Sequence, residues 1–121
     1  IKFGSKPLKV GKKAVISGWG ADEGIFYVHN LKEDTVKIIK TKKCADIYSS
    51  YTITSRMFCA DTSDYGPCWL DDADPLVVKN RLYGLLSFNN GCFDDHYPSV
   101  YTNVLSLKEW VLETIKNNTV V

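Results

Sequence analysis

The sequence lacks several features that would assign it to a common protein class. It has no uninterrupted apolar run of about 18 residues, so no membrane-spanning helix is expected. It has no Cys-x-x-Cys pair, which argues against a zinc ribbon and a thioredoxin-type motif. Its formal net charge is only +1, which indicates neither a nucleic-acid-binding protein nor an acidic solubilising tail. We expect no metal and no cofactor.

An initiator methionine and the apolar core of a signal peptide are also missing. Ile1 instead begins a segment in which lysines recur. We therefore expect a processed chain or a fragment. The 121 residues suffice for one domain with a modest core.

The net charge is small, but the charged residues are unevenly distributed along the chain. Residues 1–43 contain ten lysines and four acidic residues, a net charge of +6. Residues 44–121 contain five basic and ten acidic residues, a net charge of −5. This division is compatible with an ordinary solvated surface or with an oriented binding face.

The cysteines indicate an oxidising compartment. Their number is even, and they stand at positions 44, 59, 68 and 92. We expect two disulfides, although spacing alone leaves three pairings open. The sequon Asn117-Asn118-Thr119 makes Asn117 a candidate glycosylation site and fits a secreted protein.

Hydrophobic periodicity predicts many short strands and two helices. Residues 1–13 are interpreted as an extended connector. Strands are expected at Ala14–Ser17, within 26–41, and at Ile53–Cys59, Pro75–Val78, Leu82–Phe88 and Ser99–Asn103, with a turn at Lys79–Arg81. A short helix is expected at Thr41–Ser50 with Thr41 as N-cap, and a terminal helix of about three turns is expected with Ser106 at its cap. This pattern is typical of an antiparallel barrel or sandwich.

Five motifs together resemble one family. They are Val15-Ile16-Ser17-Gly18-Trp19-Gly20, Met57-Phe58-Cys59-Ala60, Pro75-Leu76-Val77-Val78, Leu82-Tyr83-Gly84-Leu85 and Tyr97-Pro98-Ser99-Val100-Tyr101-Thr102-Asn103-Val104. In this order they resemble the C-terminal half of trypsin/chymotrypsin-like serine proteases, and within that family the inactivated paralogues of mites. The resemblance implies an all-β fold, an antiparallel six-stranded Greek-key barrel with one C-terminal helix. Residues 1–13 would be the connector from a missing N-terminal barrel, 14–103 the barrel, and 104–121 the helix and tail.

The resemblance also implies the disulfides Cys44–Cys59 and Cys68–Cys92. A further bridge found in many family members would join the positions of Ala14 and Val78, so both of its partners are absent together.

The active-site loop departs from the family pattern Cys-x-Gly-Asp-Ser-Gly-Gly-Pro. Here the loop reads Cys-Trp-Leu-Asp-Asp-Ala-Asp-Pro from Cys68 to Pro75. Asp72 occupies the nucleophile position and Leu70 the oxyanion-hole glycine, so a negative charge would stand where an oxyanion must develop. Ala73 and Asp74 replace two further glycines, and a reshaped loop is expected if those glycines had positive φ.

The remaining acid of this loop, Asp71, is expected to be structural. A calcium site formed by Asp71, Asp72 and Asp74 is the alternative, and the family precedent of a buried salt bridge at Asp71 argues against it.

The rest of the catalytic machinery is missing or altered as well. The histidine and aspartate of the family triad belong to the N-terminal half, and His29 and His96 match neither. The specificity pocket is expected to be narrowed or filled. Its residues in this chain would be Gly66, Pro67, Ser87, Phe88, Asn89 and Ser99, of which Ser87 alone keeps the residue of the family pattern.

We therefore expect a secreted, proteolytically inactive homologue that binds macromolecules. Its expected partners are the N-terminal barrel of the same parent and host plasma or complement proteins, with no nucleic acid and no membrane. An active secreted endopeptidase, or a fragment of one, is the alternative.

Overall fold

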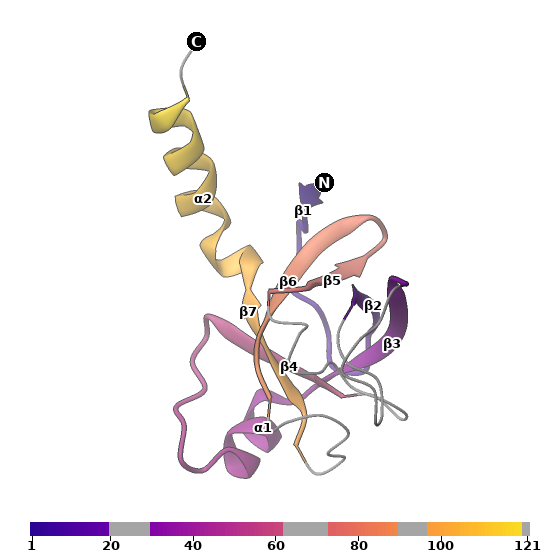
Figure 1. Ribbon diagram of the computed structural model, residues 1–121. Helices are drawn as coiled ribbons and strands as arrows, with labels where there is room; N and C mark the ends of the chain where they lie inside the picture. Colours follow the sequence, from indigo (N-terminus) through magenta and orange to yellow (C-terminus); the bar gives the residue numbers. More distant parts are fainter. Residues whose placement is uncertain (20–29, 62–72, 90–96, 120–121) are drawn as a thin grey trace.

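The computed structural model describes residues 1–19, 30–61, 73–89 and 97–119. Its elements follow one another along the chain as shown in Figure 1. They are β1 (Lys2–Phe3), β2 (Lys13–Gly18), β3 (Lys32–Ile39), α1 (Thr41–Ile47), β4 (Met57–Asp61), β5 (Pro75–Val78), β6 (Arg81–Phe88), β7 (Ser99–Asn103) and α2 (Val104–Asn118).

Six of the strands close into an antiparallel barrel. Neighbouring strands pair in the order β5-β2-β3-β4-β7-β6, and β5 pairs with β6 to complete the ring. The expected six-stranded barrel with a C-terminal helix is therefore confirmed. The short strand β1 adds to it by pairing in parallel with β6, with Lys2 opposite Arg81. Residues 1–13 thus contain a strand that their polar composition did not predict.

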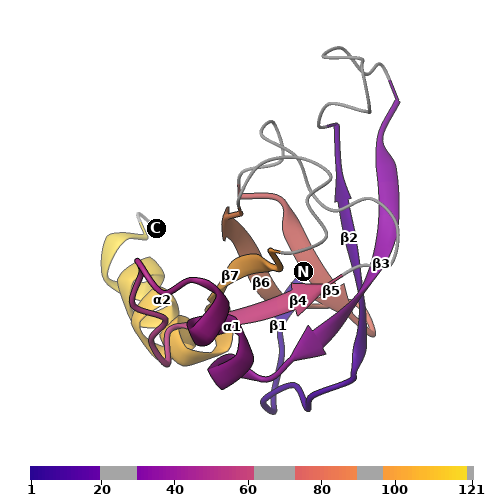
Figure 2. The ribbon, with the colours of Figure 1, turned by 90° about the horizontal axis from the view of Figure 1, so that it is seen from below.

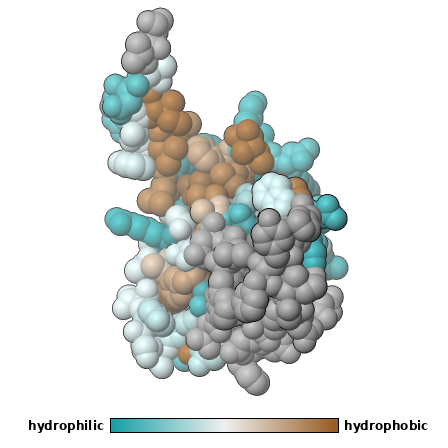
Figure 3. Space-filling model, in the orientation of Figure 1, coloured by the Kyte–Doolittle hydropathy of each residue, from teal (hydrophilic) through white to brown (hydrophobic). Residues whose placement is uncertain are grey.

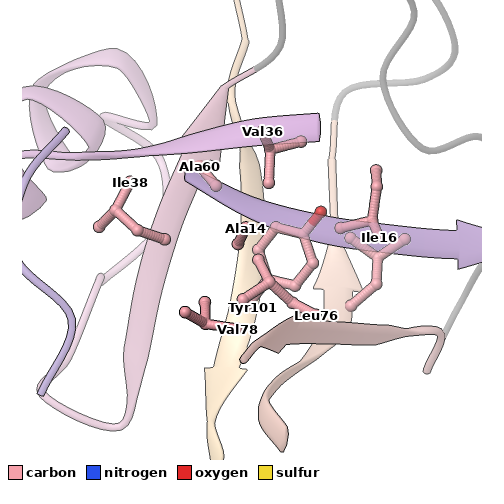
Figure 4. Packing of buried hydrophobic residues seen from close by; sticks show 9 residues of the cluster. Ala14, Ile16, Val36, Ile38, Ala60, Leu76, Val78 and Tyr101 are labelled. Carbon is pink, nitrogen blue, oxygen red and sulfur yellow. The ribbon is translucent and has the colours of Figure 1, made fainter. Parts of the chain in front are cut away.

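The barrel interior is filled because side chains on a strand alternate between its two faces. On β2, Ala14 and Ile16 are buried, whereas the intervening Val15 is exposed. The same alternation buries Val36 and Ile38 on β3. Figure 4 shows these side chains gathered inside the barrel with Leu76, Val78, Ala60 and Tyr101.

A second core cluster joins α1 to the barrel wall. Cys44 of α1 and Cys59 of β4 form a disulfide with an S–S distance of 2.01 Å. Both are fully buried beside Tyr48 and Val100. The short helix, which has little intrinsic stability, is thereby fixed to β4 at the lower edge of the barrel in Figure 1.

Two of the predicted helix caps are wrong. Helix α1 has Lys40, not Thr41, at its N-cap, and α2 begins at Val104 after Asn103 at the N-cap. Neither N-cap side chain makes a capping hydrogen bond. Ser106 lies inside the first turn of α2, where its hydroxyl donates a hydrogen bond to the Asn103 carbonyl at 2.7 Å. The helices therefore begin where the strands before them end.

The predicted strand limits are right for β5 and β7 and shifted elsewhere. The strand expected at Ile53–Cys59 runs from Met57 to Asp61, because the preceding residues form a turn in which the Met57 N–H bonds to the Thr54 carbonyl. The turn between β5 and β6 is confirmed. Lys79 and Asn80 have φ values of 49° and 60°, as a two-residue type I′ hairpin requires.

Helix α2 projects from the barrel instead of lying across it (Figure 1). Its first turns contact β6 and β1, and Lys108 Nζ lies 3.5 Å from the Gly4 carbonyl oxygen. Farther along, Trp110, Leu112 and Ile115 are exposed. Figure 3 shows hydrophobic surface that runs along the helix and continues onto the adjoining end of the barrel.

Candidate functional site

The described part of the candidate active-site loop begins at Ala73. Its backbone N–H donates to the Leu86 carbonyl at 2.9 Å, and the Leu86 N–H donates to the Asp74 carbonyl at 2.9 Å. This pair of bonds fixes the loop end to β6. Ala73 has φ 68°, the left-handed region that favours glycine. Ala73 therefore has the backbone conformation that favours glycine, the residue that the family pattern has at this position.

Asp74 lies where this fixed segment enters β5. The residue is half-buried, and its Oδ2 atom is buried. Asp74 thus puts a carboxylate at a position where the family pattern has a glycine, which has no side chain beyond a hydrogen atom. It adds volume and a polar group at this position.

The four described residues of the predicted pocket come together at one end of the β6–β7 pair. Ser87, Phe88 and Asn89 end and follow β6, and Ser99 begins β7. The register places Phe88 opposite Val100, with an irregularity between Leu86 and Phe88. Ser99 is buried at 7% exposure, whereas Ser87 is exposed.

An aromatic cluster that the sequence did not predict packs at this end of the barrel. Tyr48 lies at its centre, with ring centroids 5.5 Å from Phe88 and 5.4 Å from Tyr97, both edge-on. Its hydroxyl donates a hydrogen bond to the Pro98 carbonyl. Tyr51 lies 5.3 Å from Phe88 and is 62% exposed. The cluster ties α1 to the two strands that form the pocket wall.

The sequence carried one weak signal for this cluster. Tyr48 and Tyr51 stand three residues apart just after the short helix, so they can share one face. Their partners Phe88 and Tyr97 are distant in the chain, and no local pattern connects them.

The central residues of the predicted site lie outside the described residues. They are Gly66, Pro67, Leu70, Asp71 and Asp72, the pair Cys68–Cys92, and both histidines, His29 and His96. The predicted disulfide Cys44–Cys59 is confirmed. Asn117 is exposed in the last turn of α2, as a glycosylation acceptor must be.

Neither a metal centre nor a membrane segment is found in the described part of the chain. In residues 1–19, 30–61, 73–89 and 97–119, no three histidine, cysteine or acidic side chains gather to hold a metal ion. None of the helices in these ranges has the length and hydrophobicity needed to cross a bilayer.

Comparisons with known proteins show which proteins this chain resembles. The model of the trypsin family matches residues 1–111. The chain is 38% identical over 114 residues to trypsin eta of Drosophila melanogaster, covering 92% of this chain and 44% of that protein. It is 41% identical over 111 residues to a vitellin-degrading protease of Bombyx mori, covering 88% of this chain and 42% of that protein.

A solved structure agrees with these sequence matches. Neuropsin, a serine protease expressed in the limbic system of mouse brain, superposes with a TM-score of 0.87 at 31% identity. The match covers 95% of this chain and 53% of that one. The chain therefore spans about half the length of the relatives it matches.

Proposed function

Because the chain belongs to the trypsin family of serine proteases, we propose that it is the C-terminal barrel of a secreted member without proteolytic activity. The observation that carries this proposal is the aspartate at position 72, in the place of the family's nucleophilic serine. A carboxylate is a weak nucleophile toward an amide, and its charge would oppose the oxyanion that must form beside it.

The substitutions around Asp72 support the same proposal. Leu70 replaces the glycine expected at the oxyanion hole, and Asp74 adds a half-buried carboxylate where the family pattern has a glycine. Losing the serine alone would still leave a site able to bind a substrate carbonyl. Losing the glycines as well removes the room that such binding requires.

The barrel framework supports a retained function other than catalysis. The interior alternation, the buried disulfide and the closed ring of strands are all present. We propose that the protein binds macromolecules, with host plasma or complement proteins as partners if the mite relationship holds. Secretion is supported by the disulfide, because such bonds persist in oxidising compartments.

We further propose that the apolar side of α2 packs against an N-terminal barrel of the same parent protein. The support is the exposure of Trp110, Leu112 and Ile115, together with a length about half that of the relatives. A surface of this kind is seldom left in water on a folded protein.

The test is activity of the full-length protein toward a panel of peptide substrates and a serine-directed fluorophosphonate probe. We expect no turnover and no labelling, and we expect the same result for Asp72→Ser alone. A variant that also carries Leu70→Gly, Ala73→Gly and Asp74→Gly separates loss of the nucleophile from closure of the site. Activity of the unmodified protein would contradict the proposal, and activity of Asp72→Ser alone would contradict the closure argument.

An active endopeptidase is the second candidate. It is favoured by the relatives, since trypsin eta, the vitellin-degrading protease and human serine protease 1 are all named as proteases or trypsins at 34–41% identity. Labelling of the unmodified protein by the fluorophosphonate would select this candidate.

A further inference from the structure

Six exposed lysines gather where the connector, β3 and α1 meet. The connector turn is fixed to β3 by two backbone bonds, from the Gly11 N–H to the Ile38 carbonyl and from the Ile38 N–H to the Lys12 carbonyl. Leu8 and Val10 share a surface hollow with Ile39 and Thr41, which brings the connector beside the start of α1 (Figure 2). The group, named here the lysine face, consists of Lys9, Lys12, Lys13, Lys37, Lys40 and Lys43, all exposed.

The positive charge of the lysine face is poorly compensated. Within the described ranges, none of the six lysines has a salt bridge to a carboxylate; Lys42, next to the face, pairs with Asp46 at 3.8 Å. Asp61 stands opposite Lys37 in the register with β4. Glu33 lies four residues along β3 from Lys37, about 13 Å away. The face therefore keeps a net positive charge of several units.

Two of these lysines oppose each other in a way that costs stability. Lys13 of β2 and Lys37 of β3 are direct partners in the antiparallel register, and both point outward from the barrel. Like charges at directly opposite positions destabilise a sheet. A bound anion would remove that repulsion.

The composition of the face favours a polyanion over a protein partner. Protein interfaces are depleted in lysine and depend on buried aromatic or arginine anchors. The lysine face contains neither, because all ten basic residues in 1–43 are lysines. Lysine offers a compact, strongly hydrated point charge, which suits binding by charge density rather than the bidentate pairing to carboxylate or phosphate that arginine makes.

We propose that the lysine face binds a linear sulfated polysaccharide, with the ammonium groups meeting successive sulfates along the chain. Sulfates keep their full charge and offer acceptor oxygens to ammonium groups. The extracellular location that the disulfide supports is where such polymers occur. The six residues that define the face are all lysines, so they offer no aromatic ring on which nucleic-acid bases could stack. The proposal does not depend on whether the protein is a protease.

The test compares two triple variants of the full-length protein that lose the same charge. The first carries Lys13→Gln, Lys37→Gln and Lys40→Gln within the face. The second carries Lys2→Gln, Lys79→Gln and Lys116→Gln, exposed positions on other elements. Binding to heparin, to desulfated heparin of equal length, to phosphatidylserine vesicles and to duplex DNA is measured at two salt concentrations.

We expect the unmodified protein to bind heparin and to lose at least about tenfold in affinity between 50 and 200 mM salt, as charge-driven binding to polyanions does. The face variant should lose about tenfold or more, and the control variant less than about threefold. Desulfated heparin should bind weakly. Equal losses in both variants, no heparin binding, or equally tight binding to vesicles or DNA would overturn the proposal.

A stability measurement tests the same proposal without a binding assay. Lys13→Gln should raise the melting temperature of the free protein at low salt by relieving its repulsion with Lys37. It should also reduce the additional rise that heparin produces, since a ligand stabilises only by its affinity for the folded state. A heparin-induced rise that is unchanged in Lys13→Gln and in the face variant would overturn the proposal.

Discussion

The barrel buries its apolar side chains, whereas helix α2 exposes several of its own to solvent. Leu76, Val36 and Tyr101 are essentially inaccessible inside the barrel, whereas Trp110 and Ile115 on α2 are 66% and 57% exposed. The barrel closes on itself through the β5–β6 and β6–β7 pairings. The helix has no such closure within the described residues and presents its apolar side chains to solvent. The barrel is therefore complete as a packing unit, whereas the apolar side of the helix is exposed, which is the basis for proposing a further surface that it covers.

The largest change in the free energy of unfolding is expected for a substitution in the barrel interior. Leu76→Ala removes a side chain that is 0% exposed and leaves a cavity among Ile16, Val36 and Leu86. We expect a loss of about 2–5 kcal/mol in the free energy of unfolding. Urea denaturation followed by circular dichroism measures it. A loss below about 1 kcal/mol would show that the barrel is not packed as a closed core.

The second prediction concerns the disulfide that fixes α1 to the barrel. Replacing Cys44 and Cys59 together by alanine should cost about 3 kcal/mol, since the bridge spans a sequence separation of 15 residues. The aromatic cluster should loosen as well, because Tyr48 follows α1 directly. Near-ultraviolet circular dichroism reports on the packing of Tyr48 and Phe88. A near-ultraviolet spectrum that is unchanged would show that the cluster holds α1 without the bridge.

A third substitution tests how tightly the barrel is packed. A Cβ atom at Gly84 would lie 2.6 Å from Phe58 Cζ and 3.2 Å from Tyr101 Cβ, two rings that stack at 5.6 Å. Gly84→Ala should therefore cost about 1–3 kcal/mol through overpacking. Gly11→Ala is the matched control: nothing lies within 4 Å of its Cβ, so its net cost, about 0.5 kcal/mol, would come from its φ of +86° alone. Similar costs at both sites would indicate that the Gly84 contact relaxes freely.

Much of the barrel could be predicted because its signals are local. Alternation along β2 and β3 and the Lys79-Asn80 turn specify strands and a hairpin within a few residues. The pairing of β1 with β6 has no such signal, since two residues cannot show a period. The helix starts were misplaced because Lys40 and Asn103 make no side-chain cap from which a start could be read.

The candidate site was harder to predict than the barrel. Spacing left three cysteine pairings open, and the Cys44–Cys59 pair came from the family resemblance rather than from geometry. The contacts of Tyr48 with Phe88 and Tyr97 join residues 40 to 49 positions apart. Such contacts are set by the closure of the barrel and not by neighbouring residues.

A smaller change in the free energy of unfolding, in this case a stabilisation, is expected for a substitution where the barrel meets the active-site loop. Ala73 has φ 68°, which costs a residue with a Cβ atom about 1–2 kcal/mol and glycine almost nothing. After the greater chain entropy of glycine in the unfolded state is subtracted, Ala73→Gly should stabilise by about 0.5 kcal/mol. Ala45→Gly in α1, at an ordinary helical position, should instead destabilise by about 1 kcal/mol. Destabilisation by both would mean that the strain at Ala73 is not released by glycine.

The smallest change in the free energy of unfolding of this chain is expected for a substitution in α2. Leu112 is 49% exposed, so Leu112→Ala should change the free energy of unfolding by less than about 0.5 kcal/mol. In a full-length protein whose second barrel covers the helix, the same substitution should cost about 2 kcal/mol or more. Glu109→Ala, exposed on the same helix, controls for changes in helix propensity. Equal costs for Leu112→Ala in both settings would show that α2 stands free even in the full-length protein, and its apolar side chains would then need another partner.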